Sequence, residues 1–369
     1  MITLGCLSHQ INDPGTPGQI IWQSTYIPSD RFVIGMWKFR PKPLVSVIVA
    51  SYNHEAYAAT AVSSVLRQGV EDLEVIVVDD GSSDATPDVI ERLGDPRVLI
   101  IRLAENRRVH PRNLALGLAR GRYIAFQNSD DEWEDGKLSA QLEVLENNKQ
   151  VVACFTGVDL IGKDGEPTSG TWANGLFTTE NRTSARWLRH FFDASNCLCI
   201  SSAVVRSRDV KKVGCFRPHL VQLSDLDLWV RLAAVGEFHI IDQPMTKMRV
   251  IPDRNISRPS PEIARRGMIE YAEVLARYAE RPVCERILEA FHDVIPQHAQ
   301  SPVAQLSGLA IHAWTLSPAH HLFADRVLSD ILDSPQKREE LVRVFGTNVI
   351  HTFIKKRGEI QFNLIREEQ

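Results

Sequence analysis

The chain has 369 residues, of which 44% are hydrophobic and 24% charged, with a net charge of −4 and a pI near 6.3. This composition indicates a globular protein long enough for two domains, without the basic excess that is typical of nucleic-acid-binding proteins. We see no apolar segment long enough for a transmembrane helix and no signal peptide. We therefore expect a cytoplasmic protein without a nucleic-acid partner, and leave open a peripheral association at the inner face of the membrane.

The chain divides into three regions by its residue pattern. Residues 1–42 are interrupted by glycine and proline and are expected to form an N-terminal extension that packs on the next region. Strands and helices alternate through residues 43–258, which predicts an α/β domain with a mostly parallel sheet and right-handed crossovers. Residues 259–369 have helical apolar spacing and are expected to form a helical C-terminal region.

The first half of the α/β region contains four short apolar runs, each of which predicts a buried strand. These runs are Leu44–Ala50, Leu73–Val78, Arg97–Leu103 and Tyr123–Gln127. Helices are predicted between them at Ala58–Gln68, from Pro87 with Thr86 as its cap, and at Pro111–Arg120.

The second half of the α/β region has a less regular pattern. We predict helices at Lys137–Leu145 and Asp225–Ala234, strands at Val151–Phe155, Cys197–Val205 and His239–Ile241, and a turn at Asp164-Gly165. Further helices are predicted at Glu262–Tyr278, Val283–Val294 and Leu322–Leu332. The six cysteines show no Cys-x-x-Cys spacing, so we expect reduced thiols, with Cys197 and Cys199 on one face of a strand.

Acidic residues follow two of the predicted buried strands and open a later helix. Asp79 and Asp80 end the second strand, Asn128–Asp131 end the fourth, and Asp225 and Asp227 begin the helix. Taken singly, each could be a turn or a helix cap. Because the carboxyl ends of parallel strands share one edge of a sheet, the first two clusters together favour a ligand site there. Carboxylate oxygens suit a hard cation such as Mg²⁺ or Mn²⁺.

The first strand ends in Ala50-Ser51-Tyr52-Asn53, which contains no glycine-rich phosphate loop. Tyr52 offers a ring on which a base could stack, although packing at the strand end is the simpler alternative. Arg112 opens the third helix and could reach a diphosphate, whereas Arg107 and Arg108 are more typical of a solvated loop.

Several segments together resemble the family 2 inverting glycosyltransferases of the GT-A fold. They are Leu44–Asn53, Val77–Ser83, Glu105–Asn113, Gly121–Trp133 and Ser224–Leu232. The resemblance implies a GT-A fold over residues 43–250, with a Rossmann-like sheet flanked by helices. It also implies sugar transfer from a nucleotide sugar, for which we favour UDP, to a glycan or lipid-linked acceptor in surface polysaccharide synthesis.

The resemblance also implies roles for individual residues. Asp225 matches the catalytic base, and Asp130 matches the metal-binding aspartate of the Asp-x-Asp motif, with Mg²⁺ or Mn²⁺ as the ion. The nucleotide sugar is expected to contact Ala50, Ser51, Tyr52, Asp80, Arg112 and Asn128. Asp227 is expected to cap or support the helix that carries Asp225.

Two positions depart from the family pattern and weaken the case for a metal. Asn128 replaces the first aspartate of Asp-x-Asp, and Ile251 occupies a position two residues after Arg249 where many relatives have a metal-binding histidine. Asp253 and Asn255 are candidate substitutes, and no physical argument selects either. These departures motivate an alternative, a non-catalytic nucleotide-sugar-binding or scaffold module. A nucleotidyltransferase is less well supported, since no lysine-containing triphosphate loop is present.

Overall fold

The computed structural model describes residue 37 and residues 40–106, 111–178, 180–251, 255–258 and 260–366, with side chains described as far as residue 359. Most of the expected N-terminal extension at residues 1–42 therefore lies outside the described residues. Arg107, Arg108 and Asp253 lie outside them as well.

The described chain contains an eight-stranded sheet with the order β3-β2-β1-β4-β7-β6-β8-β5. The strands are β1 (Val45–Ser51), β2 (Leu73–Asp79), β3 (Val98–Arg102), β4 (Tyr123–Asn128), β5 (Glu132–Trp133), β6 (Val151–Ile161), β7 (Val204–Arg206) and β8 (Glu237–Arg249). Strands β1 to β4 pair with one another in parallel, as do β6 and β8, whereas β7 is antiparallel to β4 and β6, and β5 is antiparallel to β8. The predicted mostly parallel sheet is confirmed.

The central strands are apolar on both faces because helices cover both sides of the sheet. Successive residues point to opposite faces, so Val47 of β1 joins one core cluster and Ile48 joins the other. The flanking helices are α2 (Ala58–Leu66), α3 (Thr86–Glu91), α4 (Pro111–Leu118), α5 (Lys137–Asn147), α6 (Ser184–Ala194), α7 (Ser207–Val213) and α8 (Ser224–Ala233). Residues of α2 and α5 belong to the cluster of Val47, and residues of α4, α6 and α8 to that of Ile48.

The predicted strand at Cys197–Val205 is wrong over most of its length. Only Val204–Arg206 pairs as β7, and a short 3₁₀ turn, η1 (Ile200–Ser202), precedes it. In this segment side chains satisfy backbone groups: Trp133 Nε1 donates to the Ser201 carbonyl at 2.8 Å, and Gln141 Nε2 donates to that of Ser202 at 2.8 Å. The apolar run therefore reflects burial, and Cys197 and Cys199 are buried thiols outside any strand.

The predicted strand at His239–Ile241 is much longer than expected. It extends over Glu237–Arg249 as β8 and pairs with the equally extended β6. The register of this pair shifts on either side of Gly157, which stands opposite Pro244. Pro244 interrupts the apolar pattern of the segment, so the pattern predicts a shorter strand. The long strand carries Arg249 to the loop after β4.

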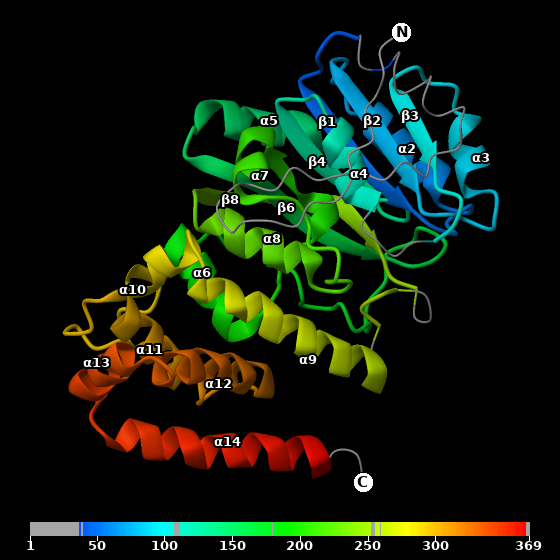
Figure 1. The fold of residues 1–369 in the computed structure, drawn as a ribbon. Helices are drawn as coiled ribbons and strands as arrows, with labels where there is room; N and C mark the ends of the chain where they lie inside the picture. The colour runs from blue at the N-terminus through cyan, green and yellow to red at the C-terminus, as the bar shows by residue number, and fades with distance from the viewer. Residues whose placement is uncertain are drawn as a thin grey trace, which may run out of the picture.

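The C-terminal region is helical, as predicted, although the segment at residues 283–294 forms only short turns. Its elements are α9 (Pro261–Leu275), η2 (Ala276–Ala279), η3 (Val283–Arg286), α10 (Ile287–Ala290), α11 (Pro302–Ala313), α12 (Pro318–Leu332), α13 (Pro335–Phe345) and α14 (Asn348–Arg366). Figure 1 shows α10 to α14 gathered on one side of the molecule, with α9 running between them and the sheet. No helix in the described residues is both long and apolar enough to cross a membrane.

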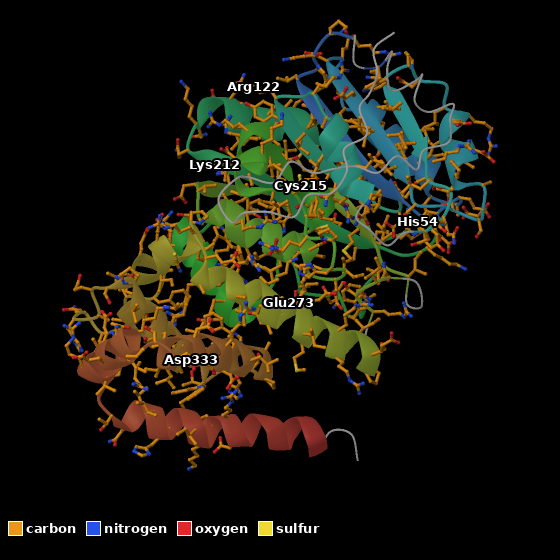
Figure 2. All side chains as sticks on the ribbon, viewed as in Figure 1. His54, Arg122, Lys212, Cys215, Glu273 and Asp333 are labelled. Atoms are coloured by element: carbon orange, nitrogen blue, oxygen red, sulfur yellow. The ribbon has the colours of Figure 1, made fainter. Side chains whose placement is uncertain are left out.

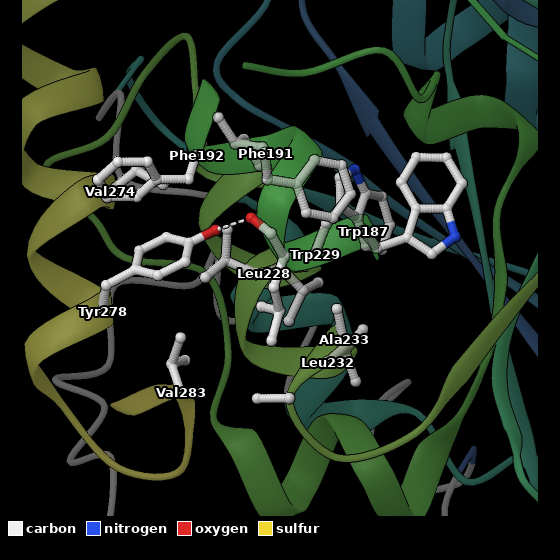
Figure 3. Packing of buried hydrophobic residues seen from close by; sticks show 14 of the residues in the cluster. Trp187, Phe191, Phe192, Leu228, Trp229, Leu232, Ala233, Val274, Tyr278 and Val283 are labelled. Carbon is white, nitrogen blue, oxygen red and sulfur yellow. Dashed lines mark hydrogen bonds between the residues drawn. The ribbon is translucent and has the colours of Figure 1, made fainter. Parts of the chain in front are cut away.

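One core cluster continues from the sheet into these C-terminal helices. Trp187 and Phe191 of α6 lie beside Trp229 of α8, and Phe192 packs edge-on against Tyr278 of η2 at 4.9 Å between ring centroids (Figure 3). The Tyr278 hydroxyl donates to the Leu188 carbonyl at 2.6 Å, which satisfies its polar end inside the cluster. This packing fixes α8, and therefore Asp225, against the C-terminal region.

Candidate functional site

The candidate site lies at the carboxyl ends of β1, β2 and β4. Ala50 of β1 stands in register with Val78 of β2 on one side and Asn128 of β4 on the other. The strand order therefore brings the residues after β1, β2 and β4 to one edge of the sheet, as the sequence predicted. In an open α/β sheet this is the edge at which ligands bind.

The turn after β1 exposes Tyr52. Asn53 has a φ of 53°, a left-handed conformation that asparagine tolerates better than most residues. Its side-chain oxygen accepts from the Ser83 backbone nitrogen at 2.9 Å, and its own backbone nitrogen donates to the Ser82 hydroxyl at 2.9 Å. Tyr52 is left 44% exposed, so its ring is available to a ligand.

The two aspartates after β2 have different surroundings. Asp79 accepts from the Ser51 hydroxyl at 3.0 Å and from the hydroxyl and backbone nitrogen of Ser82 at 2.6 and 2.9 Å. The carboxylate of Asp79 thus organises the loop, and the Ser51 hydroxyl is engaged in doing so. Asp80 is 6% exposed, and its backbone nitrogen donates to the Ser51 carbonyl at 2.9 Å.

Asn128 is held by two charged neighbours. Arg112 Nη2 donates to Asn128 Oδ1 at 2.6 Å, and Asn128 Nδ2 donates to Asp131 Oδ2 at 3.0 Å. The amide thus connects a cation to an anion, which an aspartate at this position could not do because it has no donor. The only side-chain oxygen of Asn128 is occupied by arginine.

Asp131 is a structural carboxylate. It accepts from the Arg249 backbone nitrogen at 2.9 Å, from the Ser201 hydroxyl at 2.5 Å and from Asn128. Sequence reasoning placed Asp131 in the acidic cluster without separating its role from that of Asp130. These three donors come from residues 3 to 118 positions away along the chain, which is why the pattern alone does not reveal them.

Asp130 differs from Asp131 because its carboxylate faces a histidine. His54 Nε2 lies 3.9 Å from Asp130 Oδ2, while the Nδ1 of the same ring pairs with the Ser129 hydroxyl at 2.8 Å. Burial raises the pKa of Asp130, and the positive charges of Arg249 and Arg112 oppose that rise. Sequence reasoning missed His54, whose only signal is its place two residues after Tyr52.

Arg249 holds the loop after β4 in place. Its Nε donates to the Asp130 carbonyl at 2.9 Å, its Nη1 donates to the Gly162 carbonyl at 2.6 Å, and its Nη2 pairs with Glu132. Its guanidinium also stacks 4.5 Å from the centre of the Tyr57 ring.

Asn255 does not offer a free oxygen as a substitute metal ligand. Its Oδ1 accepts from the Ile251 backbone nitrogen at 2.6 Å, and its Nδ2 donates to the Arg249 carbonyl at 3.1 Å. The side chain closes a turn. Of the two substitutes considered, Asp253 lies outside the described residues.

Asp225 opens α8 with its carboxylate held in two ways. Its Oδ2 accepts from Asn196 Nδ2 at 3.0 Å, and its Oδ1 accepts from the Leu226 backbone nitrogen at 2.8 Å. Burial raises the pKa of Asp225 to about 6, against the opposing charge of Arg112. A carboxylate with this pKa is ionised at neutral pH and is a stronger base than an exposed aspartate.

Asp227, two residues later, faces the other side of α8. It is fully buried and accepts from Arg217 Nε at 3.1 Å and from Arg231 Nε and Nη2 at 2.9 and 2.6 Å. The expectation that Asp227 supports the helix agrees with these contacts.

Arg112 connects the parts of the site electrostatically. Burial lowers the pKa of its guanidinium, and the negative charges of Asp225, Asp130 and Asp131 oppose that shift. One partly buried cation therefore lies near the predicted base, the predicted metal ligand and the structural carboxylate. Among the described residues no three His, Cys, Asp or Glu side chains gather as a complete metal site. Asp130 alone fits an ion that takes its remaining ligands from a bound phosphate.

The known proteins to which this chain is similar in sequence are glycosyltransferases. Residues 46–206 match the family model described as glycosyl transferase family 2. The chain is 43% identical over 129 residues to the putative teichuronic acid biosynthesis glycosyltransferase TuaG of Bacillus subtilis (strain 168), covering 34% of this chain and 51% of TuaG. It is 30% identical over 220 residues to the uncharacterized glycosyltransferase MJ1057 of Methanocaldococcus jannaschii, covering 58% of this chain and 73% of that protein.

A third relative is the UDP-Glc:alpha-D-GlcNAc-diphosphoundecaprenol beta-1,3-glucosyltransferase WfaP of Escherichia coli, 40% identical over 107 residues. That match covers 29% of this chain and 43% of WfaP, so the chain spans about half or less of TuaG and WfaP. Among solved structures, residues 1–349 of S. aureus TarS in complex with UDP-GlcNAc superpose with a TM-score of 0.52 at 16% identity, covering 84% of this chain and 91% of that one. This likeness shows a shared fold.

Proposed function

Because this chain belongs to glycosyl transferase family 2, we propose that it transfers a sugar from a nucleotide-sugar donor to an acceptor hydroxyl, with inversion at the anomeric carbon. The observation that carries the proposal is the placement of Arg112, whose Nη2 donates to Asn128 Oδ1 at 2.6 Å, two residues before Asp130. Arg112 is also near enough to Asp225 and Asp130 for their negative charges to oppose the fall in its pKa. A base, a cation for a diphosphate and a metal-binding carboxylate are the three groups that such a transfer needs.

Asp225 is the proposed catalytic base. Its carboxylate takes the proton of the acceptor hydroxyl as the hydroxyl oxygen bonds to the anomeric carbon and the bond from that carbon to the diphosphate breaks. A single displacement inverts the configuration and needs no covalent intermediate. The hydrogen bonds from Asn196 and from the Leu226 backbone nitrogen hold the carboxylate in one orientation, so little reorganisation is needed before proton transfer.

The donor is proposed to lie over the carboxyl ends of β1, β2 and β4. Tyr52 offers an exposed ring beside the base, Ala50 and Ser51 supply the strand end beneath it, and Asp80 accepts from a base nitrogen. Arg112 and Asn128 lie towards the diphosphate and ribose. WfaP uses a UDP-linked sugar by its name, which supports UDP as the nucleotide here.

A divalent cation, Mg²⁺ or Mn²⁺, fits the site only with help from the donor. Asp130 is the carboxylate proposed to hold it, since the side-chain oxygens of Asp131 and Asn128 already accept hydrogen bonds from the Arg249 backbone nitrogen, the Ser201 hydroxyl and the Arg112 guanidinium. When bound, such an ion neutralises the charge that develops on the departing diphosphate. Arg112 supplies a second positive charge in the same place.

The acceptor is proposed to be a glycan or a lipid-linked saccharide of a surface polysaccharide. The names of TuaG and WfaP, which refer to teichuronic acid and to a diphosphoundecaprenol-linked sugar, support this class. A lipid-linked acceptor implies contact with the membrane surface. We further propose that residues 43–258 form the transferase domain and residues 259–369 a helical region that supports it.

The proposal is tested by measuring nucleotide release from a panel of UDP-sugars in the presence of Mn²⁺, together with calorimetric titration of UDP. We expect the wild type to bind UDP and to hydrolyse its preferred donor slowly without an acceptor. Asp225→Asn should retain UDP binding and lose turnover. Asp159→Asn, which changes an exposed carboxylate on β6, is the matched control and should behave as the wild type.

The same experiment addresses the alternative of a non-catalytic module. If the wild type and Asp225→Asn bind UDP equally and neither releases it from any donor, with or without glycan and lipid-linked acceptors, the transferase proposal is wrong. The binding-module interpretation would then remain.

A further inference from the structure

A cavity of about 150 Å³ lies between α7, the loop before α8 and the segment after α9. Among the residues that line it, five are cationic and one is acidic: Lys212, Arg217, Arg231, Arg277, Arg281 and Glu280. A wall so rich in arginine and lysine is unusual for a cavity enclosed by two parts of one chain, because like charges repel when water is scarce. The chemistry of the lining points to an anion.

Carboxylates neutralise only part of this charge. Asp227 lies beneath the cavity and pairs with Arg217 and Arg231, and its Oδ1 is 3.5 Å from Arg277 Nε. Glu280 pairs with Arg277 and lies 3.7 Å from Arg217 Nη2. At the rim, Glu285 pairs with Arg281 at 3.0 Å, but both side chains are largely exposed, and such a pair is weak. Five cations therefore face three carboxylates.

The guanidinium groups differ in how many donors remain for a ligand. All donors of Arg231 are used, on Asp227 and on the carbonyls of residues 213, 214 and 215. Arg277 is 9% exposed, and its buried Nε has no hydrogen-bond partner in the described part of the chain. Arg217 donates one hydrogen bond there, through Nε to Asp227. Arg277 Nε lies 3.5 Å from Asp227 Oδ1, and Arg277 makes a hydrogen bond from Nη1 to Glu280. In the described part of the chain, the remaining Nη donors of Arg217 and Arg277 therefore have no acceptor and are left for a ligand.

The cavity is separate from the candidate donor site. Asp225 and Asp227 are two residues apart on α8, so their side chains leave the helix on opposite sides. Asp225 turns towards Asn196 and the field of Arg112, whereas Asp227 turns towards the cavity arginines. Figure 2 shows Lys212, at the cavity, and His54, at the donor site, on opposite flanks of the molecule.

We propose that this cavity is a second anion site, which binds a phosphate group between the α/β region and the C-terminal region. A tetrahedral oxyanion matches the unused donors of Arg217 and Arg277, with Lys212 and Arg281 contributing charge at the rim. The shared chemistry is a phosphoryl group, either as free inorganic phosphate or as the end of a phosphate ester. Since Arg277, Glu280 and Arg281 belong to the C-terminal region, a bound phosphate joins that region to α7 and α8.

The test is calorimetric titration of the full chain with inorganic phosphate and, separately, with glycerol 3-phosphate, at constant ionic strength in a phosphate-free buffer. The double variant Lys212→Gln/Arg281→Gln removes two exposed rim charges, so it should fold normally. We expect it to weaken phosphate binding by about tenfold. Each of the two charges is partly screened by solvent and is expected to contribute about threefold to the affinity. The matched control is Lys211→Gln/Arg343→Gln, which changes exposed cations that do not line the cavity and should leave binding unchanged.

Two further variants separate this site from the donor site. Arg112→Gln should retain the phosphate titration, because Arg112 belongs to the donor site. Glu280→Gln should tighten phosphate binding, because it removes the carboxylate that competes for Arg277 and Arg217. A gain of affinity cannot come from misfolding.

Each outcome decides the proposal. Binding of glycerol 3-phosphate at least as tight as that of phosphate would show that the site admits a phosphate ester, and binding of phosphate alone would assign it to the free ion. The proposal is overturned if the wild type shows no heat at millimolar phosphate, if the rim double variant binds as the control does, or if Arg112→Gln abolishes the titration. None of these results depends on whether the chain transfers a sugar.

Discussion

Arg112 Nη2 donates a hydrogen bond of 2.6 Å to Asn128 Oδ1, at the position where the family pattern has an aspartate. The Nδ2 of the same asparagine donates a second hydrogen bond, to Asp131 Oδ2. An aspartate here would accept from Arg112 equally well but would face the carboxylate of Asp131 without a donor between them. The departure from the Asp-x-Asp pattern is therefore matched to its surroundings.

Replacing Asn128 by aspartate should lower the stability of the metal-free protein and raise its affinity for the metal. Without a metal, the new charge beside Asp131 is expected to lower the free energy of unfolding by about 1–2 kcal/mol. With the metal, a second carboxylate should lower the Mn²⁺ concentration at half-maximal activity, because affinity rises with the number of charged ligands. Urea unfolding and Mn²⁺ titrations of activity measure the two effects. Asn174→Asp makes the same charge change at an exposed site and should do neither.

Asp225→Asn should lower kcat by about 10³-fold, which is within the usual contribution of a general base. The dissociation constant for UDP should stay within a few-fold of the wild-type value, since the side chain is proposed to contact the acceptor. Rapid-quench or coupled assays give kcat, and calorimetry gives the affinity. A variant that loses UDP binding and turnover together would contradict the assigned role.

The same substitution should raise stability near neutral pH. The folded-state pKa of Asp225 is raised to about 6 from an ordinary value of 3.8, so the folded protein holds more protons than the unfolded chain between these values. Stability attributable to this group therefore falls as pH rises from about 4 to about 6 and stays low above it. Asp225→Asn removes the penalty, and its Tm should exceed that of the wild type at pH 7.5 but not at pH 4.

Removing the Asn196 hydrogen bond should shift the pH profile. The wild type is expected to lose kcat/KM as pH falls through about 6, because the protonated Asp225 cannot accept a proton. Asn196 donates to the ionised carboxylate and so lowers its pKa; Asn196→Ala should move the acidic limb of the profile to higher pH. An unchanged limb with a uniformly reduced rate would show that Asn196 acts only on structure.

The sequence predicted the strand edge, because short apolar runs ending in acidic residues are local signals. The roles that the family motifs assign to Asp130 and Asp225 stay predictions. The sequence did not predict the partners of these residues. His54, Asn196, Ser201 and Arg249 reach the site from distant segments, and their contacts depend on how β8 and the turn before β7 pack. The Cys197–Val205 segment shows the same limit, since burial without pairing leaves the same apolar pattern as a strand.

Substitutions of Asp130 and Asp131 test whether the first holds a metal and the second supports the structure. Asp131→Ala leaves the Arg249 backbone nitrogen and the Ser201 hydroxyl without their acceptor, and should cost about 2–3 kcal/mol of unfolding free energy. Asp130→Ala removes no hydrogen bond of this kind and should reduce activity and Mn²⁺ dependence with a smaller change in stability. Urea midpoints and Mn²⁺-dependent rates compare the two. Equal destabilisation would contradict the different roles assigned to them.

Asp227 and Asp225 lie on the same helix, α8, but their negative charges have opposite effects on stability. The charge of Asp227 stabilises the fold, whereas that of Asp225 destabilises it. Asp227→Asn leaves Arg217, Arg231 and Arg277 without their shared counter-ion, and should destabilise the fold by about 3 kcal/mol, typical of breaking a buried ion pair. The urea midpoint should fall, opposite to the rise expected for Asp225→Asn two residues away. Because the uncompensated arginines face the anion cavity, phosphate should recover part of the loss in Asp227→Asn, and chloride at equal ionic strength should recover less. If both anions act equally, only general screening operates, and the cavity has no preference for phosphate.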